Sequence, residues 1–310
     1  MLISVVIPCF NCEKTIKRCL DSISSNKDDL EIILVNDCST DDTLNVIKDY
    51  ISDSKLNIKL INNEHNLGAG ATRNIGIKSC TGEYIVFLDS DDCFVNDTIY
   101  TLKEKLEQKK YDVIIFDAYY NNKIMPMTFN KVKKSCELSM NDAFVYTKGC
   151  TCGKIYKTSI IKDNAIFFGK MKVNEDLVFT KIALFNSKNI YYLHKPLYKY
   201  ISNDTSLMNS TDKKNIALEY AYMGFDEVKK RVYNVDKELN SIYYIEVVYS
   251  TSINLFLAKE KYSIRKKLFR EMLLKHNRND IYSKKYAFKY RFMILFFKII
   301  YWRFERNEKI

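Results

Sequence analysis

The stretch 83-EYIVFLDSDD-92 joins a short apolar run to an acidic end that contains three carboxylates. An apolar run of this length is typical of a strand that helices cover on both faces, as in a parallel sheet. Similar runs lie at 2–7, 31–36 and 57–61, and helical patterns alternate with the four runs at about 12–24, 41–52, 70–80 and 96–109. Strands that alternate with helices indicate right-handed β-α-β crossovers, so the sequence predicts an α/β fold with a mostly parallel sheet.

Length and composition indicate a globular chain with a substantial core. The chain has 310 residues, and 47% of them are hydrophobic. This is enough for two domains or for one domain with additions. The nine cysteines are an odd number and the N-terminus shows no signal-peptide pattern, which favours reduced thiols in the cytoplasm. No window has the roughly 18 to 20 apolar residues of a membrane span, so we expect no integral membrane segment.

Three groups of mostly polar residues follow the predicted strands, where ligands of open α/β sheets bind. They are Pro8, Phe10 and Asn11 after the first strand, Asp37, Ser39, Asp41 and Asp42 after the second, and Asp89, Asp91 and Asp92 after the fourth. Carboxylates at a rigid strand end suit Mg²⁺ or Mn²⁺, which would carry a diphosphate. The alternative is an acidic turn before a helix that Asn96 or Asp97 caps.

Two further stretches allow both a functional and a structural interpretation. In 36-NDCSTDDT-43, Ser39 or Thr40 would cap the following helix, which leaves Asp37 unexplained. In 66-NLGAGATRNIG-76, two glycines open a helix, but Arg73 replaces the third glycine of a dinucleotide fingerprint. Arg73 in this position suggests contact with an anionic group or a base edge, and the alternative is an ordinary surface arginine.

The second half of the chain offers one acidic pair. The stretch 171-MKVNEDLVF-179 places Glu175 and Asp176 at a predicted helix start. Adjacent helical residues point about 100° apart, so only one of the two can face a bound acceptor. The alternative is a pair of acids that stabilises the helix N-terminus.

Taken in order, five stretches resemble the family 2 glycosyltransferases, which have the GT-A nucleotide-sugar fold. They are SVVIPCFN, EIILVNDCSTDDT, NLGAGATRNIG, GEYIVFLDSDD and VNEDLVF. The resemblance covers about residues 1–206 and implies a GT-A catalytic domain there, with a nucleotide-binding half at 1–92 and an acceptor half at 93–206. Phe10 stands where tyrosine is commoner and Cys38 where glycine is frequent, and neither change removes a catalytic group. The chain lacks the Q-x-x-R-W motif of processive synthases, which implies single additions.

The resemblance also implies roles for the matching residues. Asp176 would be the catalytic base, Asp37 would accept from the uracil imide, and Asp89 and Asp91 would lie nearer the ribose and the metal. The implied donor-binding residues are Pro8, Phe10, Asn11, Asp37, Asn66, Arg73, Asp89, Asp91 and Asp92. The implied metal is Mn²⁺ or Mg²⁺ on Asp91 and Asp89. The residues implied at the acceptor or in a closing loop are Glu175, His194, Tyr200 and Ser206.

The activity implied by the resemblance is inverting transfer of a sugar from a nucleotide donor, expected to be a UDP-sugar. The expected acceptor is a hydroxyl of a growing, lipid-linked surface glycan of the capsule, O-antigen, exopolysaccharide or teichoic acid type. Two alternatives stay open, a nucleotide-binding pseudoenzyme and a thiol redox protein that uses the C-x-x-C pair Cys9 and Cys12. Homo-oligomer formation also stays open.

The C-terminal region 207–310 is expected to be helical and basic. Residues 259–310 contain 16 Lys and Arg against 5 Asp and Glu, which accounts for the whole net charge of +11. Lys284, Arg291 and Lys298 recur every seven residues beside a broad apolar face. This pattern predicts a helix that lies in a membrane interface, so we expect a peripheral protein on the inner face of the plasma membrane. The alternative is packing on the protein body or on a second subunit, and no nucleic-acid-binding motif is present.

Overall fold

The computed structural model describes residues 1–23, 30–128, 132–169 and 175–201, together with positions 224, 227, 228 and 230–232. The chain divides into two compact units, Met1–Thr205 and Ser206–Ile310. All elements below belong to the first unit. Apart from those few positions, the second unit lies outside the described residues. Ser206 and the basic residues Lys284, Arg291 and Lys298 therefore lie outside them as well.

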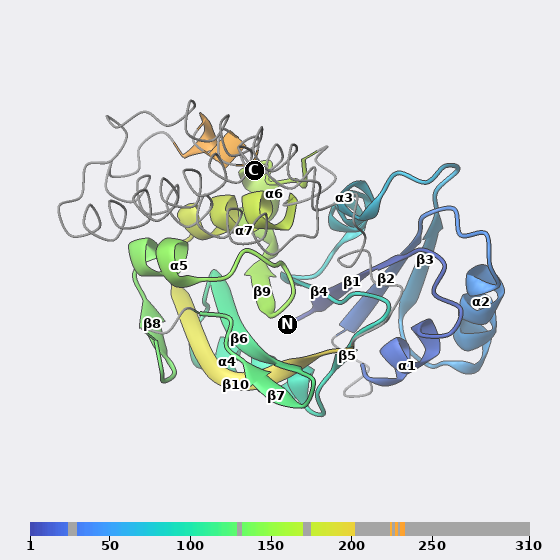
Figure 1. Ribbon diagram of the computed structural model, residues 1–310, viewed down its shortest axis with the longest axis horizontal. Coiled ribbons are helices and arrows are strands. Elements are labelled where there is room, and N and C mark those ends of the chain that lie inside the picture. Colours follow the sequence, from blue (N-terminus) through green and yellow to red (C-terminus); the bar gives the residue numbers. More distant parts are fainter. Residues whose placement is uncertain are drawn as a thin grey trace, which may run out of the picture. The chain divides into compact units, whose positions relative to one another are not determined.

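The described part of the first unit contains one sheet with helices around it (Figure 1). The strands are β1 (Ile3–Cys9), β2 (Leu30–Asn36), β3 (Ile58–Asn62), β4 (Tyr84–Phe87), β5 (Cys93–Phe94), β6 (Val113–Tyr120), β7 (Lys123–Met125), β8 (Cys136–Leu138), β9 (Lys154–Lys157) and β10 (Ile190–Tyr200). The helices are α1 (Ile16–Asp21), α2 (Thr43–Asp53), α3 (Ala69–Ser79), α4 (Thr98–Gln108), α5 (Met140–Tyr146), α6 (Thr158–Asp163) and α7 (Glu175–Phe185).

The strand order is β3-β2-β1-β4-β9-β6-β10-β5, with β7 paired to β6 and β8 to β10. Strands β1, β2, β3, β4, β6 and β10 run in one direction, and β5, β7, β8 and β9 run in the other. The predicted α/β fold with a mostly parallel sheet is therefore confirmed. The alternation of strands and helices did not predict β9, which inserts antiparallel between β4 and β6.

The central strands are buried on both faces because helices cover both. Every residue of β2 is buried, and so is every residue of β1 except Pro8. Figure 1 shows α1 and α2 on one side of the sheet and α3 on the other, as right-handed crossovers require. Helix α3 packs closely on β1, because a Cβ at Gly76 would overlap Cγ1 of Val6. A glycine inside this helix lets the helix that carries Arg73 approach the sheet.

An aromatic cluster joins the two halves of the sheet beside the end of β4. Phe87 makes edge-on contacts with Tyr156, Phe168 and Phe179. Phe168 and Phe179 stack at 4.3 Å between ring centroids. This cluster seats the N-terminal part of α7 against β4, and so fixes the distance between the acids that each element carries.

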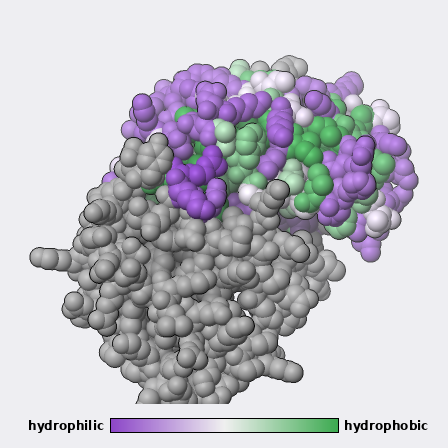
Figure 2. Space-filling model, turned by 90° about the horizontal axis from the view of Figure 1, so that it is seen from above, coloured by the Kyte–Doolittle hydropathy of each residue, from purple (hydrophilic) through white to green (hydrophobic). Residues whose placement is uncertain are grey.

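Figure 2 shows one face on which hydrophobic residues gather between hydrophilic ones. Among the residues that the structure describes, no helix combines the length and the apolar character needed to cross a membrane.

Candidate active site at the strand ends

The loops after β1 and β2 are tied to each other. The backbone N–H of Asn11 donates to Oγ of Ser39 at 3.0 Å, and Oδ1 of Asn11 accepts from the backbone N–H of Thr40 at 2.8 Å. Asp42, without a side-chain cap bond, is the N-cap of α2, so the prediction that Ser39 or Thr40 caps this helix is wrong. Asn11 has a φ of 47°, a left-handed conformation that asparagine tolerates. Its side chain therefore fixes the rim that also carries Pro8 and the exposed ring of Phe10.

Asp37 has a structural function that its position in the sequence does not reveal. Its side chain is buried. One carboxylate oxygen accepts from Asn63 Nδ2 at 2.7 Å and from the N–H of Leu67 at 2.9 Å, and the other accepts from the N–H of Gly68 at 2.8 Å. Asp37 thus holds the loop that contains the exposed Asn66. The contact of Asp37 with a uracil stays a prediction.

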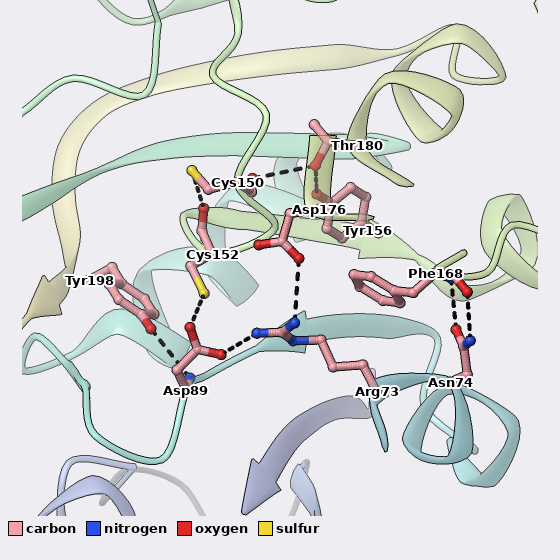
Figure 3. Close-up of polar contacts among 10 residues, drawn as sticks. All are labelled: Arg73, Asn74, Asp89, Cys150, Cys152, Tyr156, Phe168, Asp176, Thr180 and Tyr198. Carbon is pink, nitrogen blue, oxygen red and sulfur yellow. Dashed lines mark hydrogen bonds and ion pairs between the residues drawn. The ribbon is translucent and has the colours of Figure 1, made fainter. Parts of the chain in front are cut away.

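Arg73 links the acid at the end of β4 to the acid at the start of α7 (Figure 3). One terminal nitrogen of the guanidinium lies 2.6 Å from Asp89 Oδ1, and the other lies 3.3 Å from Asp176 Oδ1. The alternative of an ordinary surface arginine is therefore wrong, because Arg73 is only 5% exposed. Its Nε has no hydrogen-bond partner among the described residues. The site thus joins Asp89 and Asp176 through a single buried cation.

Burial and mutual charge determine the pKa shifts of Arg73 and Asp176. Burial opposes the charge of Arg73, but Asp89 and Asp176 outweigh that effect and raise the pKa of Arg73 further above its ordinary value. Burial, with the charge of Asp89, raises the pKa of Asp176, while Arg73 and a hydrogen bond from the backbone of Thr151 partly offset the rise. A carboxylate with a raised pKa is a stronger base than an exposed aspartate, which suits proton abstraction.

Asp91 and Asp92 have different environments. Asp92 is buried and accepts from the hydroxyl of Tyr198 at 2.6 Å and from the N–H of Ile201 at 2.8 Å, so it connects the acidic loop to the end of β10. Burial and the charges of Asp89 and Asp91 raise the pKa of Asp92 to about 8. Asp91 is partly exposed, and its backbone carbonyl accepts from Arg18 at 2.7 Å. Asp91 is thus better placed than Asp92 to meet a ligand.

The helix after the acidic loop begins at one of the two predicted cap residues, but without a capping bond. Asp97 is the N-cap of α4, but its side chain makes no capping bond and its φ is 61°. Capping by Asn96 or Asp97 therefore does not explain the carboxylates of Asp89 and Asp91.

The oxygen donors present fit a hard cation that is shared with a ligand. Within the described residues no three His, Cys, Asp or Glu side chains come together to hold a metal by themselves. Mg²⁺ in phosphate-transfer sites is usually bound by one or two carboxylates with the substrate phosphates and water. Asp89 and Asp91 together provide the two carboxylates that such a site needs.

The acceptor-side residues are only partly brought together. Glu175 lies next to Asp176 and close to α3, since a Cβ at Gly70 would lie 3.3 Å from Glu175 Cγ. Tyr200 packs on Tyr198 with 4.8 Å between ring centroids. Burial and the neighbouring Cys150, Cys152 and Asp89 raise the pKa of Tyr200, which places it beside the acidic loop.

The described contacts of His194 are with residues outside the acidic loop and α7. Its Nδ1 is 2.8 Å from Asp117 Oδ2 and 3.0 Å from the hydroxyl of Tyr192, and its backbone N–H donates to Ser135. These contacts link β10 to β6 and to the segment before β8. The placement of His194 in a closing loop stays a prediction.

The C-x-x-C pair has the wrong environment for a redox turn. Cys9 is fully buried and Cys12 is 6% exposed. The hydrogen bond with Cys12 and burial raise the pKa of Cys9, while the same bond lowers the pKa of Cys12 despite its burial. Redox-active thiols are partly exposed thiolates. The burial of both side chains therefore favours a structural role.

Sequence reasoning missed two residues that contact Asp89. The Sγ of Cys152 lies 3.4 Å from Asp89 Oδ2, and the N–H of Asp89 donates to the hydroxyl of Tyr198 at 3.3 Å (Figure 3). Cys152 lies 63 positions from Asp89 along the chain. No local pattern could reveal either contact, because strand pairing alone brings β9 and β10 to this place.

Comparison with known proteins finds a family-model match in the first half of the chain. Residues 4–143 match the family model described as Glycosyl transferase family 2. The poly(ribitol-phosphate) beta-N-acetylglucosaminyltransferase TarS of Staphylococcus aureus is 34% identical over 206 residues, which are 64% of this chain and 35% of TarS. The poly(ribitol-phosphate) beta-glucosyltransferase of Bacillus spizizenii is 33% identical over 209 residues, 63% of this chain and 32% of that protein. The chain spans about a third of the length of these relatives.

Solved structures agree on the fold. The crystal structure of S. aureus TarS 1–349 superposes with a TM-score of 0.72 at 25% identity, and the match covers 87% of this chain and 78% of that one. The complex of TarS 1–349 with UDP-GlcNAc superposes with a TM-score of 0.62 at 27% identity, and covers 88% of this chain and 72% of that one. The predicted GT-A fold is confirmed.

Proposed function

Since residues 4–143 match the family model described as Glycosyl transferase family 2, we propose that the chain is a transferase of this family, which moves a sugar, with inversion, from a UDP-sugar to a hydroxyl of a surface glycan. The observation that carries this proposal is the Arg73 bridge between Asp89 and Asp176. It brings a strand-end acid that suits a nucleotide sugar next to a carboxylate that suits proton abstraction. Transfer between a donor and an acceptor requires this proximity.

The proposed reaction uses Asp176 as the general base. Asp176 takes the proton of the acceptor hydroxyl, whose oxygen attacks the anomeric carbon of the donor sugar. The bond between that carbon and the diphosphate oxygen breaks on the opposite face, so the configuration inverts and UDP leaves. Arg73 keeps Asp176 oriented, because its guanidinium donates to Oδ1 of Asp176 in an ion pair.

The donor would lie along the rim formed by the loops after β1, β2 and β4. Asn11 holds two of these loops together and Asp37 holds the loop around Asn66. We propose that Asp89 and Asp91 hold a Mn²⁺ or Mg²⁺ ion together with the donor. When bound, this ion would neutralise the charge of the diphosphate. Asp92 accepts a hydrogen bond from the hydroxyl of Tyr198, which fastens the acidic loop to β10.

The relatives suggest the class of acceptor. The two compared above are named as transferases that act on poly(ribitol-phosphate). We propose that the acceptor here is likewise a growing surface polymer, which a lipid carries at the cytoplasmic face of the membrane. Which sugar and which polymer are involved depends on pocket side chains that the shared motifs do not determine.

A panel of nucleotide sugars tests the activity directly. The full chain should release UDP from one or more of UDP-GlcNAc, UDP-glucose and UDP-galactose, faster when a polyol-phosphate polymer is added. A matched reaction with GDP-mannose should release little GDP, because the proposed contact of Asp37 selects uracil. Calorimetric binding of UDP without any turnover would instead identify a nucleotide-binding pseudoenzyme.

We also propose that the basic C-terminal region binds the membrane surface. Each basic residue near an anionic leaflet contributes roughly 1 kcal/mol to binding, and residues 259–310 carry all of the excess positive charge. Full-length protein should sediment with anionic liposomes at low salt, and a variant that lacks residues 284–310 should stay in the supernatant while it still binds UDP. Full-length protein that stayed in the supernatant would contradict the proposal.

A further inference from the structure

The segment 149-GCTCG-153, here called the clamp segment, touches both acids of the site. Cys152 Sγ lies 3.4 Å from Asp89 Oδ2 (Figure 3). The backbone N–H of the preceding residue, Thr151, faces Asp176 and lowers the pKa of that carboxyl group. Thr151 and Cys152 are removed from solvent, at 0% and 2% exposed. One short stretch of backbone therefore reaches from the end of β4 to the start of α7.

Glycines hold the clamp segment against its neighbours at both ends. A Cβ at Gly149 would lie 2.9 Å from Cα of Leu177, the residue that follows Asp176 in α7. Gly153 has a φ of 76°, and a Cβ there would lie 2.9 Å from the carbonyl oxygen of Phe116 in β6. No side chain fits either contact, so both glycines serve close packing.

The middle of the clamp segment is anchored as well. The carbonyl oxygen of Cys150 accepts from Oγ1 of Thr180, in α7, at 3.3 Å, and also from Nζ of Lys154. Lys154 is fully buried. Burying an ammonium group costs several kcal/mol unless acceptors surround it, and a bond to this carbonyl offsets part of that cost. The clamp segment is thus fastened to α7 and β9.

We propose that the clamp segment is a positioning element of the proposed transferase site, and that Cys152 is the residue that orients Asp89 toward the donor. Arg73 occupies one oxygen of Asp89 and Cys152 occupies the other. Contacts at both oxygens restrict the rotation of the carboxylate plane of Asp89. Without the thiol, Arg73 is left as the side chain that orients this carboxylate through its oxygens, and it is shared with Asp176.

This inference rests on the proposed function, and it predicts an effect on the donor alone. Cys152→Ala removes the S–H donor, so we expect the KM for the UDP-sugar to rise about tenfold, the effect of losing one hydrogen bond to a charged group. The KM for the acceptor should stay within about twofold of wild type. Cys152→Ser has nearly the volume of alanine but restores a donor, and should return the donor KM to within about threefold of wild type.

Cys80→Ala is the matched control. Cys80 is 3% exposed, and its thiol also donates a hydrogen bond, to the carbonyl of Gly76 at 3.2 Å. Cys80→Ala should lower the melting temperature about as much as Cys152→Ala does, but it should leave the KM for the UDP-sugar unchanged. A merely structural role for Cys152 would move the melting temperature and spare the KM. Cys152→Val, which fills the space of the thiol with apolar methyl groups and has no donor, should repeat the rise in donor KM if the alanine variant does not fold.

The outcomes separate the inference from the function on which it rests. A raised donor KM in the alanine or valine variant, with rescue by serine, supports the positioning role. An active wild type with unchanged donor KM in these variants overturns the inference alone. A folded wild type that transfers no sugar from any donor of the panel overturns the proposed function and the inference together.

Discussion

Asp176→Asn is expected to lower the rate of transfer by about a hundredfold or more and to leave the affinity for UDP unchanged. Asparagine has the shape of aspartate and can still accept the hydrogen bond from Arg73, which lies 3.3 Å from Asp176 Oδ1. It cannot take a proton, so the acceptor hydroxyl would attack without general-base assistance, which is worth about 10² to 10⁴ in rate. Steady-state kinetics of UDP release, together with calorimetry of UDP binding, measures both quantities.

The matched control for this prediction is Glu175→Gln. Glu175 is the adjacent residue on α7 and carries the same charge. Its variant should retain most of the activity, because the contacts of Arg73 select Asp176 as the acid that is aligned with the donor site. If the glutamine variant were inactive and Asp176→Asn were active, Glu175 would be the base.

The pH dependence of wild-type transfer provides a second measurement of the same role. The base acts only when it is unprotonated, so the rate should fall as pH decreases through the pKa of Asp176. Burial and the charge of Asp89 raise that pKa. The acidic limb of the kcat profile should therefore lie above the range of an ordinary aspartate, which titrates near pH 4. A rate that stays constant down to pH 4 would contradict the assignment.

Asp91→Asn is expected to abolish Mn²⁺-dependent binding of UDP while the chain keeps its fold. Asp91 is partly exposed at the end of the acidic loop. An amide cannot neutralise a divalent cation, and the diphosphate would then meet the negative charge of Asp89 without compensation. Calorimetry with Mn²⁺ and with EDTA should show strong metal dependence in the wild type and little in the variant. Equal affinity of the wild type under both conditions would contradict a metal-dependent donor site.

Asp42→Asn controls for a general loss of negative charge at this rim. Asp42 lies at the start of α2, where its side chain accepts from Asn45 at 2.7 Å. It is a carboxylate of the same type with no proposed contact to the donor. The Asp42 variant should keep metal-dependent UDP binding and the melting temperature of the wild type.

Local patterns in the sequence predicted the elements that build the first half of the sheet. The apolar run at 31–36 lies within β2 and the run at 83–88 contains β4, and the structure shows the residues of both strands buried. The helical pattern at 70–80 likewise coincides with α3 to within a residue at each end. These predictions succeed because burial on both faces and helical periodicity are properties of contiguous residues.

Predictions about capping failed because capping depends on exact backbone geometry. Ser39 and Thr40 are suitable cap residues by type, yet their bonds to Asn11 draw them toward the loop after β1. Asp97 occupies a cap position with a left-handed φ, from which its side chain makes no capping bond. Residue type establishes only that a cap is available, and contacts with distant loops decide whether it forms.

The sequence by itself determined the α/β class, the alternation of the first strands with helices, and the candidate acids Asp89 and Asp176, since each rests on a run or motif of neighbouring residues. Only the tertiary structure decided that Arg73 joins those two acids, that Asp37 holds the loop around Asn66, and that Cys152 reaches Asp89. These contacts connect residues 16 to 103 positions apart. Strand pairing brings such residues together, and pairing between distant strands depends on the packing of the whole sheet, which no local pattern contains.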